Sequence, residues 1–147
     1  MSTFKISLKP HERVYINGAV IKVDRKTSLE FLNDVQFLLE SQVLQATEAD
    51  TPLKRLYFTV QIQLMSPSDT TAARRMFKEQ LEQLLLTFEE STVRDSLVAV
   101  ERLVADGRFH EAMKSLKSLY PIEQRLLNGI NTSFPFEESE PLQAKAG

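Results

Sequence analysis

The segment from Asp50 to Met65, DTPLKRLYFTVQIQLM, constrains the fold more than any other part of this chain. Asp50 or Thr51 can cap a helix at its start, and Pro52 suits the first helical position because its missing N–H would have no helical partner there. The apolar residues recur at helical spacing in two stripes. These are Leu53, Leu56, Tyr57, Val60 and Leu64, and then Phe58, Ile62 and Met65. A helix that is apolar on two sides must be covered on two sides. We therefore predict a central helix with a small sheet on one flank and a helical bundle on the other.

The residues before this helix alternate between apolar and polar like short β-strands. Phe4 to Leu8 has the period of a strand with one buried face, and Pro10 ends it. Asn17-Gly18 lies between the apolar runs RVYI and AVIKV, which is a strong signal for a hairpin with a two-residue turn. Such a turn sets the register, so that Arg13 faces Lys22 and shares one face of the hairpin with Tyr15.

Two further apolar runs, SLEFL and VQFLLE, are separated by Asn33-Asp34 and predict a second hairpin. Both faces of these runs carry apolar residues, which indicates strands that are covered on both sides. Together the runs before residue 40 predict about five short strands in a small antiparallel sheet. A sheet of this size is marginal alone, so we expect it to pack on the central helix.

The residues after the central helix are periodic like helices. We predict a helix from Thr70 to Glu89, a third that is capped by Ser91 or Thr92 and ends at Gly107, and a fourth that Pro121 kinks or restarts. The fold class is α+β, with an antiparallel β lobe over 1–45 packed on a bundle of about four helices over 46–129. The polar, proline-containing residues 130–147 predict a flexible tail on a single compact unit.

The composition narrows the chemistry and the compartment. The chain has 147 residues and no cysteine, so disulfides, thiolate metal sites and cysteine nucleophiles are excluded. No run approaches the roughly 20 apolar residues of a membrane span, and the N-terminus lacks the apolar core of a signal peptide. We expect a cytoplasmic protein without membrane contact.

The charge is distributed unevenly along the chain. The net charge is −2, but residues 1–26 hold six lysines and arginines against two carboxylates, which is +4, and the remainder is therefore −6. A local basic lobe can meet a phosphate backbone even on an acidic protein.

The outer face of the first predicted hairpin carries the best candidate site. Arg13 and Lys22 flank Tyr15, and single-stranded RNA is held by bases that stack on aromatic rings while cations track the phosphates. Three further cations lie close by in the sequence, Lys9, Arg25 and Lys26. Secondary candidates are Lys54 and Arg55 on the central helix and the pair Arg74 and Arg75 on the next helix. Two other interpretations stay open: Tyr15 packs under a helix, and the lysines only keep an edge strand soluble.

Catalysis has little support in the sequence. The two histidines, His11 and His110, lie in different predicted lobes, and no glycine-rich phosphate loop or known catalytic motif is present. His11 falls opposite Asp24 in the hairpin register, which favours a cross-strand pair over a metal site. We predict a protein that is not an enzyme and carries no cofactor.

The chain resembles the FlbT family of bacterial flagellin-synthesis regulators in two long segments. These are LKPHERVYINGAVI near the N-terminus, which DRK follows, and then ADTPLKRLYFTVQIQLMSP. The resemblance runs from about Phe4 to the helices before Asn128. It implies a post-transcriptional repressor that acts on the leader region of flagellin messenger RNA, lowers its translation or stability, and is balanced by a small antagonist protein, FlaF.

A second class of function is open beside this one. The amphipathic helices could present a groove to a partner helix, as adaptors and export chaperones do. The chain would then act through flagellin or a FlaF-like partner without touching RNA. Excess apolar helix surface also makes a homodimer a reasonable expectation.

Overall fold

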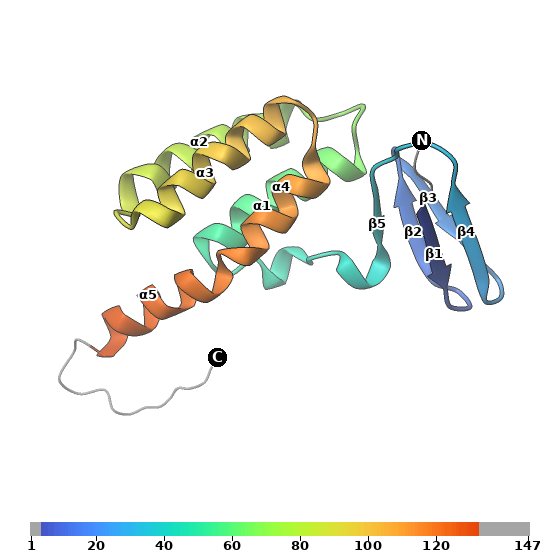
Figure 1. Ribbon diagram of the computed structural model, residues 1–147, viewed down its shortest axis with the longest axis horizontal. Coiled ribbons are helices and arrows are strands. Elements are labelled where there is room, and N and C mark those ends of the chain that lie inside the picture. Colours follow the sequence, from blue (N-terminus) through green and yellow to red (C-terminus); the bar gives the residue numbers. More distant parts are fainter. Residues whose placement is uncertain (1–3, 133–147) are drawn as a thin grey trace.

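The computed structural model describes residues 4–132, with side chains described as far as 129. A β lobe at the N-terminus is followed by two short 3-10 turns and then by a helical lobe (Figure 1). The strands are β1 (Phe4–Leu8), β2 (Arg13–Ile16), β3 (Ala19–Lys22), β4 (Thr27–Phe31) and β5 (Phe37–Leu39). The turns are η1 (Glu40–Gln42) and η2 (Ala46–Glu48). The helices are α1 (Pro52–Met65), α2 (Thr71–Thr87), α3 (Ser91–Ala105), α4 (Phe109–Ser118) and α5 (Tyr120–Thr132). The predicted α+β class is confirmed.

The first hairpin has the predicted register. β2 and β3 pair antiparallel with Arg13 opposite Lys22 and Tyr15 opposite Val20. Asn17 and Gly18 both have positive φ, 49° and 87°, as a type I′ turn requires. The dipeptide therefore sets the pairing of the hairpin.

The predicted second hairpin is wrong. β4 pairs with β1, whereas β5 pairs with β2, so the strands form two small sheets in the orders β1-β4 and β3-β2-β5. The residues between β4 and β5 do not make a tight turn, because Gln36 binds the helical lobe there. Its Nε2 donates to Gly107 O at 2.7 Å, and its Oε1 accepts from Phe109 N at 2.8 Å. A long-range contact thus overrides the local turn signal of Asn33-Asp34.

β5 is covered on both faces, as its apolar residues indicated. Leu38 is 2% exposed and belongs to the hydrophobic core of the helical lobe, while Phe37 and Leu39 pack with the core of the β lobe. This strand therefore joins the two cores.

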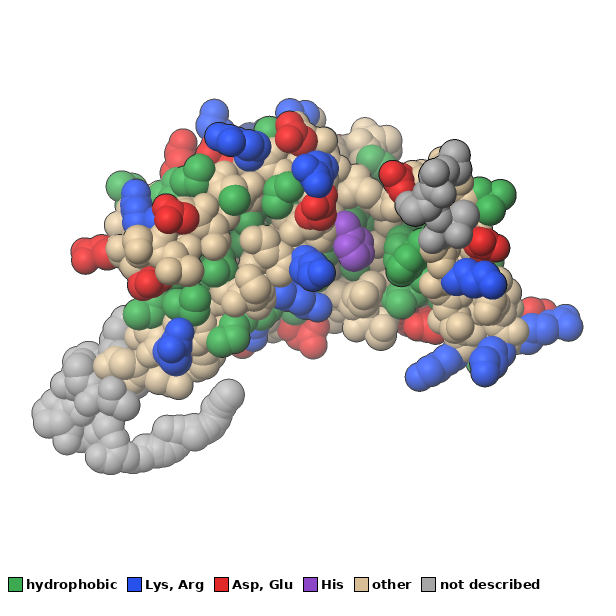
Figure 2. Space-filling model, in the orientation of Figure 1, with side chains coloured by type: hydrophobic (Ala, Val, Ile, Leu, Met, Phe, Trp, Pro, Cys, Tyr) green, Lys and Arg blue, Asp and Glu red, His purple; other side chains and the backbone are tan. Residues whose placement is uncertain are grey.

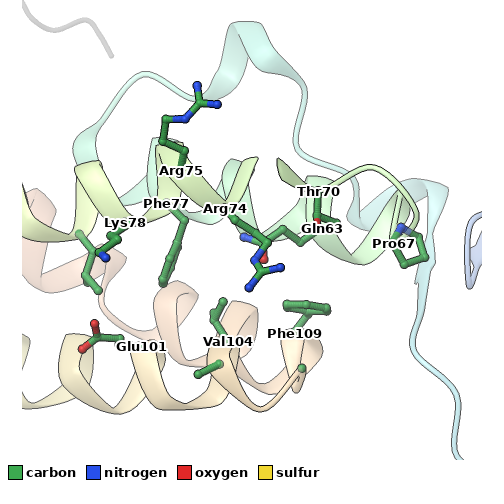
Figure 3. A pocket seen from close by; sticks show the side chains of 13 residues that line it. Gln63, Pro67, Thr70, Arg74, Arg75, Phe77, Lys78, Glu101, Val104 and Phe109 are labelled. Atoms are coloured by element: carbon green, nitrogen blue, oxygen red, sulfur yellow. The ribbon is translucent and has the colours of Figure 1, made fainter. Parts of the chain in front are cut away.

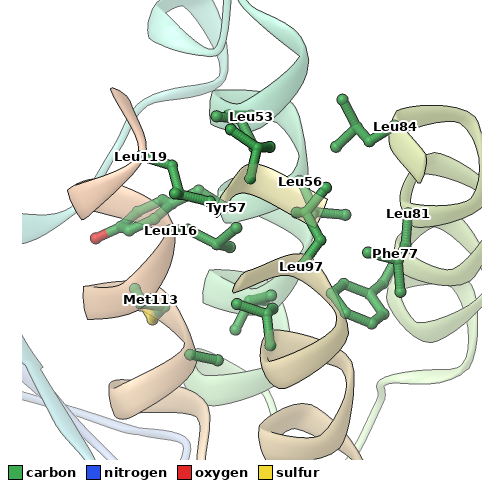
Figure 4. Packing of buried hydrophobic residues seen from close by; sticks show 14 of the residues in the cluster. Leu53, Leu56, Tyr57, Phe77, Leu81, Leu84, Leu97, Met113, Leu116 and Leu119 are labelled. Carbon is green, nitrogen blue, oxygen red and sulfur yellow. The ribbon is translucent and has the colours of Figure 1, made fainter. Parts of the chain in front are cut away.

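α1 lies at the centre of the helical lobe. Thr51 Oγ1 accepts from Lys54 N at 3.2 Å and Pro52 is the first helical residue, which confirms the predicted start. The apolar stripe of α1 that begins at Leu53 packs against α2, α3 and α4 (Figure 4). The buried apolar side chains of the helix are Leu53, Leu56, Tyr57, Val60 and Leu64, each at most 3% exposed.

Several helix ends differ slightly from the predictions. α3 is capped by Glu90, whose Oε1 accepts from Val93 N at 3.1 Å, and not by Ser91 or Thr92. The chain turns at Gly107, which has φ 75°, as predicted. Pro121 restarts the helix: α4 ends at Ser118 and α5 begins at Tyr120, giving five helices where about four were expected. α5 continues to Thr132, past the predicted end at 129, and the rest of the predicted tail lies outside the described residues.

Within residues 4–132, every helix is too short or too polar to cross a bilayer.

Candidate nucleic-acid interface

Two loops lie together at one end of the β lobe. Residues 9–12 join β1 to β2 and residues 23–26 join β3 to β4, and the pairing of Leu8 with Thr27 and of Arg13 with Lys22 places both loops at the same end. A backbone hydrogen bond from His11 N to Val23 O, 2.7 Å, ties them to each other. We call this surface the basic end; its cations are Lys9, Arg13, Lys22, Arg25 and Lys26.

All five cations of the basic end are exposed. Figure 2 shows blue side chains gathered at the lower right of the molecule, over this end of the β lobe. Lys9, Lys22 and Lys26 take part in no ion pair within the described part of the chain. The structure therefore brings together cations that are spread over 18 positions of the sequence (9 to 26).

Two carboxylates partner the other two cations. Arg13 Nη1 lies 3.8 Å from Glu40 Oε2, and Arg13 N donates to Glu40 Oε1 at 2.9 Å. Arg25 Nε lies 3.4 Å from Asp24 Oδ1, with both side chains more than three-quarters exposed. Exposed pairs of this kind contribute about 0–1 kcal/mol, so both guanidinium groups stay available to an incoming phosphate.

Tyr15 differs from the cations beside it in the predicted site. It is half-buried and packs against the core of the helical lobe. Its strand neighbour Leu38 is a member of that core. This position fits the interpretation in which Tyr15 supports the packing of the two lobes, and a role in base stacking stays a prediction.

Lys54 and Arg55 do not join the basic end. They lie in the first turn of α1, whereas the loop after the last turn of α1 meets the β lobe at Gly18, where an added Cβ would come within 3.4 Å of Pro67 Cδ. A helix of 14 residues is about 21 Å long. Lys54 Nζ is also 3.5 Å from Asp50 Oδ1 and 5.8 Å from the centroid of the Tyr120 ring.

The predicted pair of His11 and Asp24 is not formed among the described residues. Asp24 faces Arg25 instead, and His11 has a left-handed backbone with φ 67°. No three metal-binding side chains of the His, Asp or Glu type meet within residues 4–132.

Sequence reasoning missed Glu40 as the partner of Arg13. The two residues are 27 positions apart and meet only because β5 pairs with β2, the pairing that the local turn signal obscured. No signal near Arg13 in the sequence could have revealed it.

A hollow lies between α2, the end of α3 and the start of α4, with a volume of about 650 Å³. Its floor contains Phe77, Leu81, Val104 and Phe109. In Figure 3, Arg74 and Phe77 point from α2 toward α3 and α4, whereas Arg75 points away. We call this hollow the α2–α3 groove.

The described residues form a small α+β protein with exposed cations gathered at one end of its β lobe. Comparison with known proteins narrows this class. The family model described as "Flagellar protein FlbT" matches residues 4–127. The chain therefore belongs to the FlbT family.

Relatives from several bacteria cover most of the chain. It is 51% identical over 128 residues to a probable flagellum biosynthesis repressor protein FlbT of Mesorhizobium japonicum, covering 87% of each chain. It is 52% identical over 127 residues to the protein of the same name from Chelativorans sp., covering 86% of this chain and 88% of the relative. The corresponding protein of Agrobacterium fabrum is 46% identical over 127 residues, covering 86% and 85%. No solved structure matches the chain. The family and the names of these relatives support a regulatory role in flagellar synthesis.

Proposed function

We propose that this protein represses flagellin synthesis in the cytoplasm by binding the leader of flagellin messenger RNA through the basic end. The observation that carries the proposal is that two joined loops and the strand ends beside them bring together Lys9, Arg13, Lys22, Arg25 and Lys26 on a chain whose net charge is −2. The family supplies the flagellar context, and the names of the relatives supply the repressor role.

The physical basis is the release of counterions. Each cation that neutralises a phosphate of a single strand displaces condensed salt, and log K falls against log salt with a slope of about 0.7 per contact. The three unpaired lysines can contribute such contacts directly. Arg13 and Arg25 must first leave the carboxylates of Glu40 and Asp24, at a cost of about 0–1 kcal/mol each.

A bound leader would lower translation by covering the start of the message, and binding alone is enough for this role. The test is binding of flagellin leader RNA by the purified full chain over a series of salt concentrations. We expect tight binding at low salt with a negative slope of log K against log salt. A wild-type protein that binds no leader RNA at low salt, yet captures flagellin from solution, would overturn the proposal.

The α2–α3 groove supports a second candidate function, docking of a protein partner. The groove combines an apolar floor with the cations Arg74, Arg75 and Lys78 and one carboxylate, Glu101, and none of the four forms an ion pair within the described residues. An amphipathic helix with an acidic face, from a FlaF-like antagonist or from flagellin, matches this lining. Repression would then respond to the partner.

A charge reversal on α2 tests the groove. Arg74→Glu should abolish capture of a FlaF-like protein or of flagellin, because the residue points into the groove (Figure 3). Arg102→Glu carries the same charge change at an exposed site on α3 that does not line the groove. Equal capture by both variants would rule the groove out as the docking site.

Large apolar side chains on the outer faces of α2 and α3 support a homodimer as part of the proposal. Leu86 is 80% exposed and Val98 is 46% exposed. Sedimentation of the full chain at several concentrations tests this, and a monomer at every concentration would contradict it.

A further inference from the structure

Four aromatic rings form a cluster at the seam between the β lobe and α4. The ring of Phe37 lies at the centre, with centroid distances of 5.6 Å to Phe4, 5.2 Å to Phe31 and 5.6 Å to His110. The interplanar angles are 34–37°, so the rings are tilted stacks and not edge-on contacts. The rings of this cluster come from strands β1, β4 and β5 and from the first turn of α4.

The four rings line a pocket of about 450 Å³, and Asn33, Asp34 and Val35 complete the wall of this pocket. This volume falls within the range of small-ligand sites, roughly 300–1,000 Å³. The side chains of Asn33 and Asp34 are exposed and form no hydrogen bond within the described residues, so their polar atoms are available to a ligand. We call this site the ring pocket.

Packing in the hydrophobic core explains the positions of only two of the four rings. Phe31 and Phe37 are half-buried and belong to the core of the β lobe. Phe4 is 56% exposed and His110 is exposed as well. Figure 2 shows a histidine beside exposed hydrophobic side chains at the seam of the lobes. Phe4 and His110 thus offer ring surface to solvent.

Lys114 lies close to the ring cluster. Lys114 follows His110 by one helical turn on α4, and its charge is the second cause, after burial, that lowers the pKa of His110; Lys117 is the third. Lys114 is exposed and forms no ion pair within residues 4–132. Lys117 is engaged elsewhere, since its Nζ lies 5.8 Å from the centroid of the Tyr57 ring.

We infer that the ring pocket binds one unpaired nucleobase of single-stranded RNA, packed against the exposed rings of Phe4 and His110, with the adjoining phosphate over Lys114. Asn33 and Asp34 hydrogen-bond the edge of the base. The ligand class rests on the proposed function. Unpaired bases are recognised by stacking on aromatic rings and by polar contacts at their edges, and cations hold the backbone.

The pocket and the basic end can serve the same strand of RNA. Phe4 begins β1 and Leu8 ends it next to the basic end, so the two sites are separated by one strand length, about 13 Å. The basic end supplies charge without base recognition. The ring pocket supplies the preference for unpaired over paired RNA.

The test uses the full chain and a short unstructured ribo-oligonucleotide that carries one 2-aminopurine. The protein has no tryptophan, so the fluorescence of this base is read without interference. Stacking of this base on a ring should quench its fluorescence. Phe4→Ala and His110→Ala should each weaken binding by about 5- to 150-fold, the loss typical of one stacked base, and should abolish this quenching. Lys114→Ala should flatten the slope of log K against log salt by about 0.7. Leu32→Ala is the control, because Leu32 is 66% exposed beside Phe31 and lies outside the pocket.

These variants should fold. The side chain of Phe4 is largely in solvent, and the backbone N–H of His110, not its imidazole, donates to Gln36 Oε1 at 3.2 Å. A second measurement needs no variant at all. The chain has two histidines, and a base stacked on His110 should shift its imidazole proton resonances by ring current while those of His11 stay in place.

The outcomes separate the two proposals. If wild type binds RNA but Phe4→Ala and His110→Ala bind it equally well, the inference fails and the proposed function stands. If wild type binds no RNA, both fail. Loss of flagellin capture in the ring-pocket variants, with RNA binding unchanged, would show that the pocket takes a ring from a protein and would also overturn the inference.

Discussion

Gln36 and Gly107 are joined by a hydrogen bond of 2.7 Å across 71 positions of the chain. The same side chain also receives the N–H groups of Phe109 and His110, at 2.8 and 3.2 Å, so one amide caps the start of α4 and satisfies the turn after α3. The free N–H groups of a helix start need such partners. Gln36 is therefore a clamp between the segment before β5 and the helical lobe.

Replacing Gln36 by alanine should lower the free energy of unfolding by about 1–3 kcal/mol, because a carbonyl and two N–H groups lose their partner. Urea unfolding measures the change. Gln83→Ala serves as the control, since Gln83 is exposed on α2, and it should leave the midpoint nearly unchanged. Equal midpoints for the two variants would show that water replaces the clamp without cost.

Glu123 provides a second long-range cap. Its side chain is 2% exposed and its Oε2 accepts from Leu53 N at 2.9 Å, at the positive end of the α1 dipole. Glu123→Ala should cost roughly 1–3 kcal/mol, and Glu123→Gln should cost less because the amide oxygen can still accept. Thermal unfolding compares both with Glu82→Gln on the exposed face of α2. A larger loss for Gln than for Ala would contradict this account.

Val60 is fully buried at the centre of α1. Val60→Asp should prevent stable folding, since an unpaired buried carboxylate costs several kcal/mol, which is close to the whole stability of a small domain. Circular dichroism and a melting curve test this, with Ala99→Asp on the exposed side of α3 as the control. A soluble Val60→Asp protein with an unchanged melting temperature would show that α1 is not the centre of the core.

Removal of charge from the basic end should change the salt dependence of RNA binding. Replacing Arg13 and Lys22 together by alanine should flatten the slope of log K against log salt by about 0.7 for each lost phosphate contact. Arg102→Ala, an exposed site on α3, should leave the slope unchanged.

Tyr15→Ala should cost about 1–3 kcal/mol in binding if a base stacks there. Its folding must be measured first, because Tyr15 packs against the helical core.

His110 should make stability depend on pH. Burial, and then the charges of Lys114 and Lys117, lower the pKa of His110 below its usual 6.5 in the folded protein. The unfolded chain therefore binds the proton more readily, so stability is full above about pH 6.5 and falls as the pH drops toward the lowered pKa. Urea midpoints measured through this range should decline for wild type, and the decline should be smaller for His110→Gln. Identical slopes would place the pH dependence elsewhere.

Local signals in the sequence predicted the parts of the fold that depend on nearby residues. Thr51 with Pro52 marked the start of α1, and Asn17-Gly18 set the register of the first hairpin. The pairing of β5 with β2 was missed because Gln36 is held by residues more than 70 positions away. Sequence-local reasoning has no access to such a contact.

The candidate site shows the same division. The hairpin register was enough to group Arg13 with Lys22, and the two loops add the other cations of the basic end. The environment of Tyr15 depends on β5, and the ring pocket takes its rings from four separate segments of the chain. Neither could be derived before the strands were paired.

The turn at Gly18 approaches the loop between α1 and α2 so closely that a methyl group added there would touch Pro67 at 3.4 Å. The positive φ of 87° independently disfavours any side chain at this position. The first carbon of any side chain there would already fill the space up to Pro67, in a backbone conformation that side chains rarely adopt. Glycine at the tip of the hairpin thus lets the β lobe and the loop after α1 lie in direct contact.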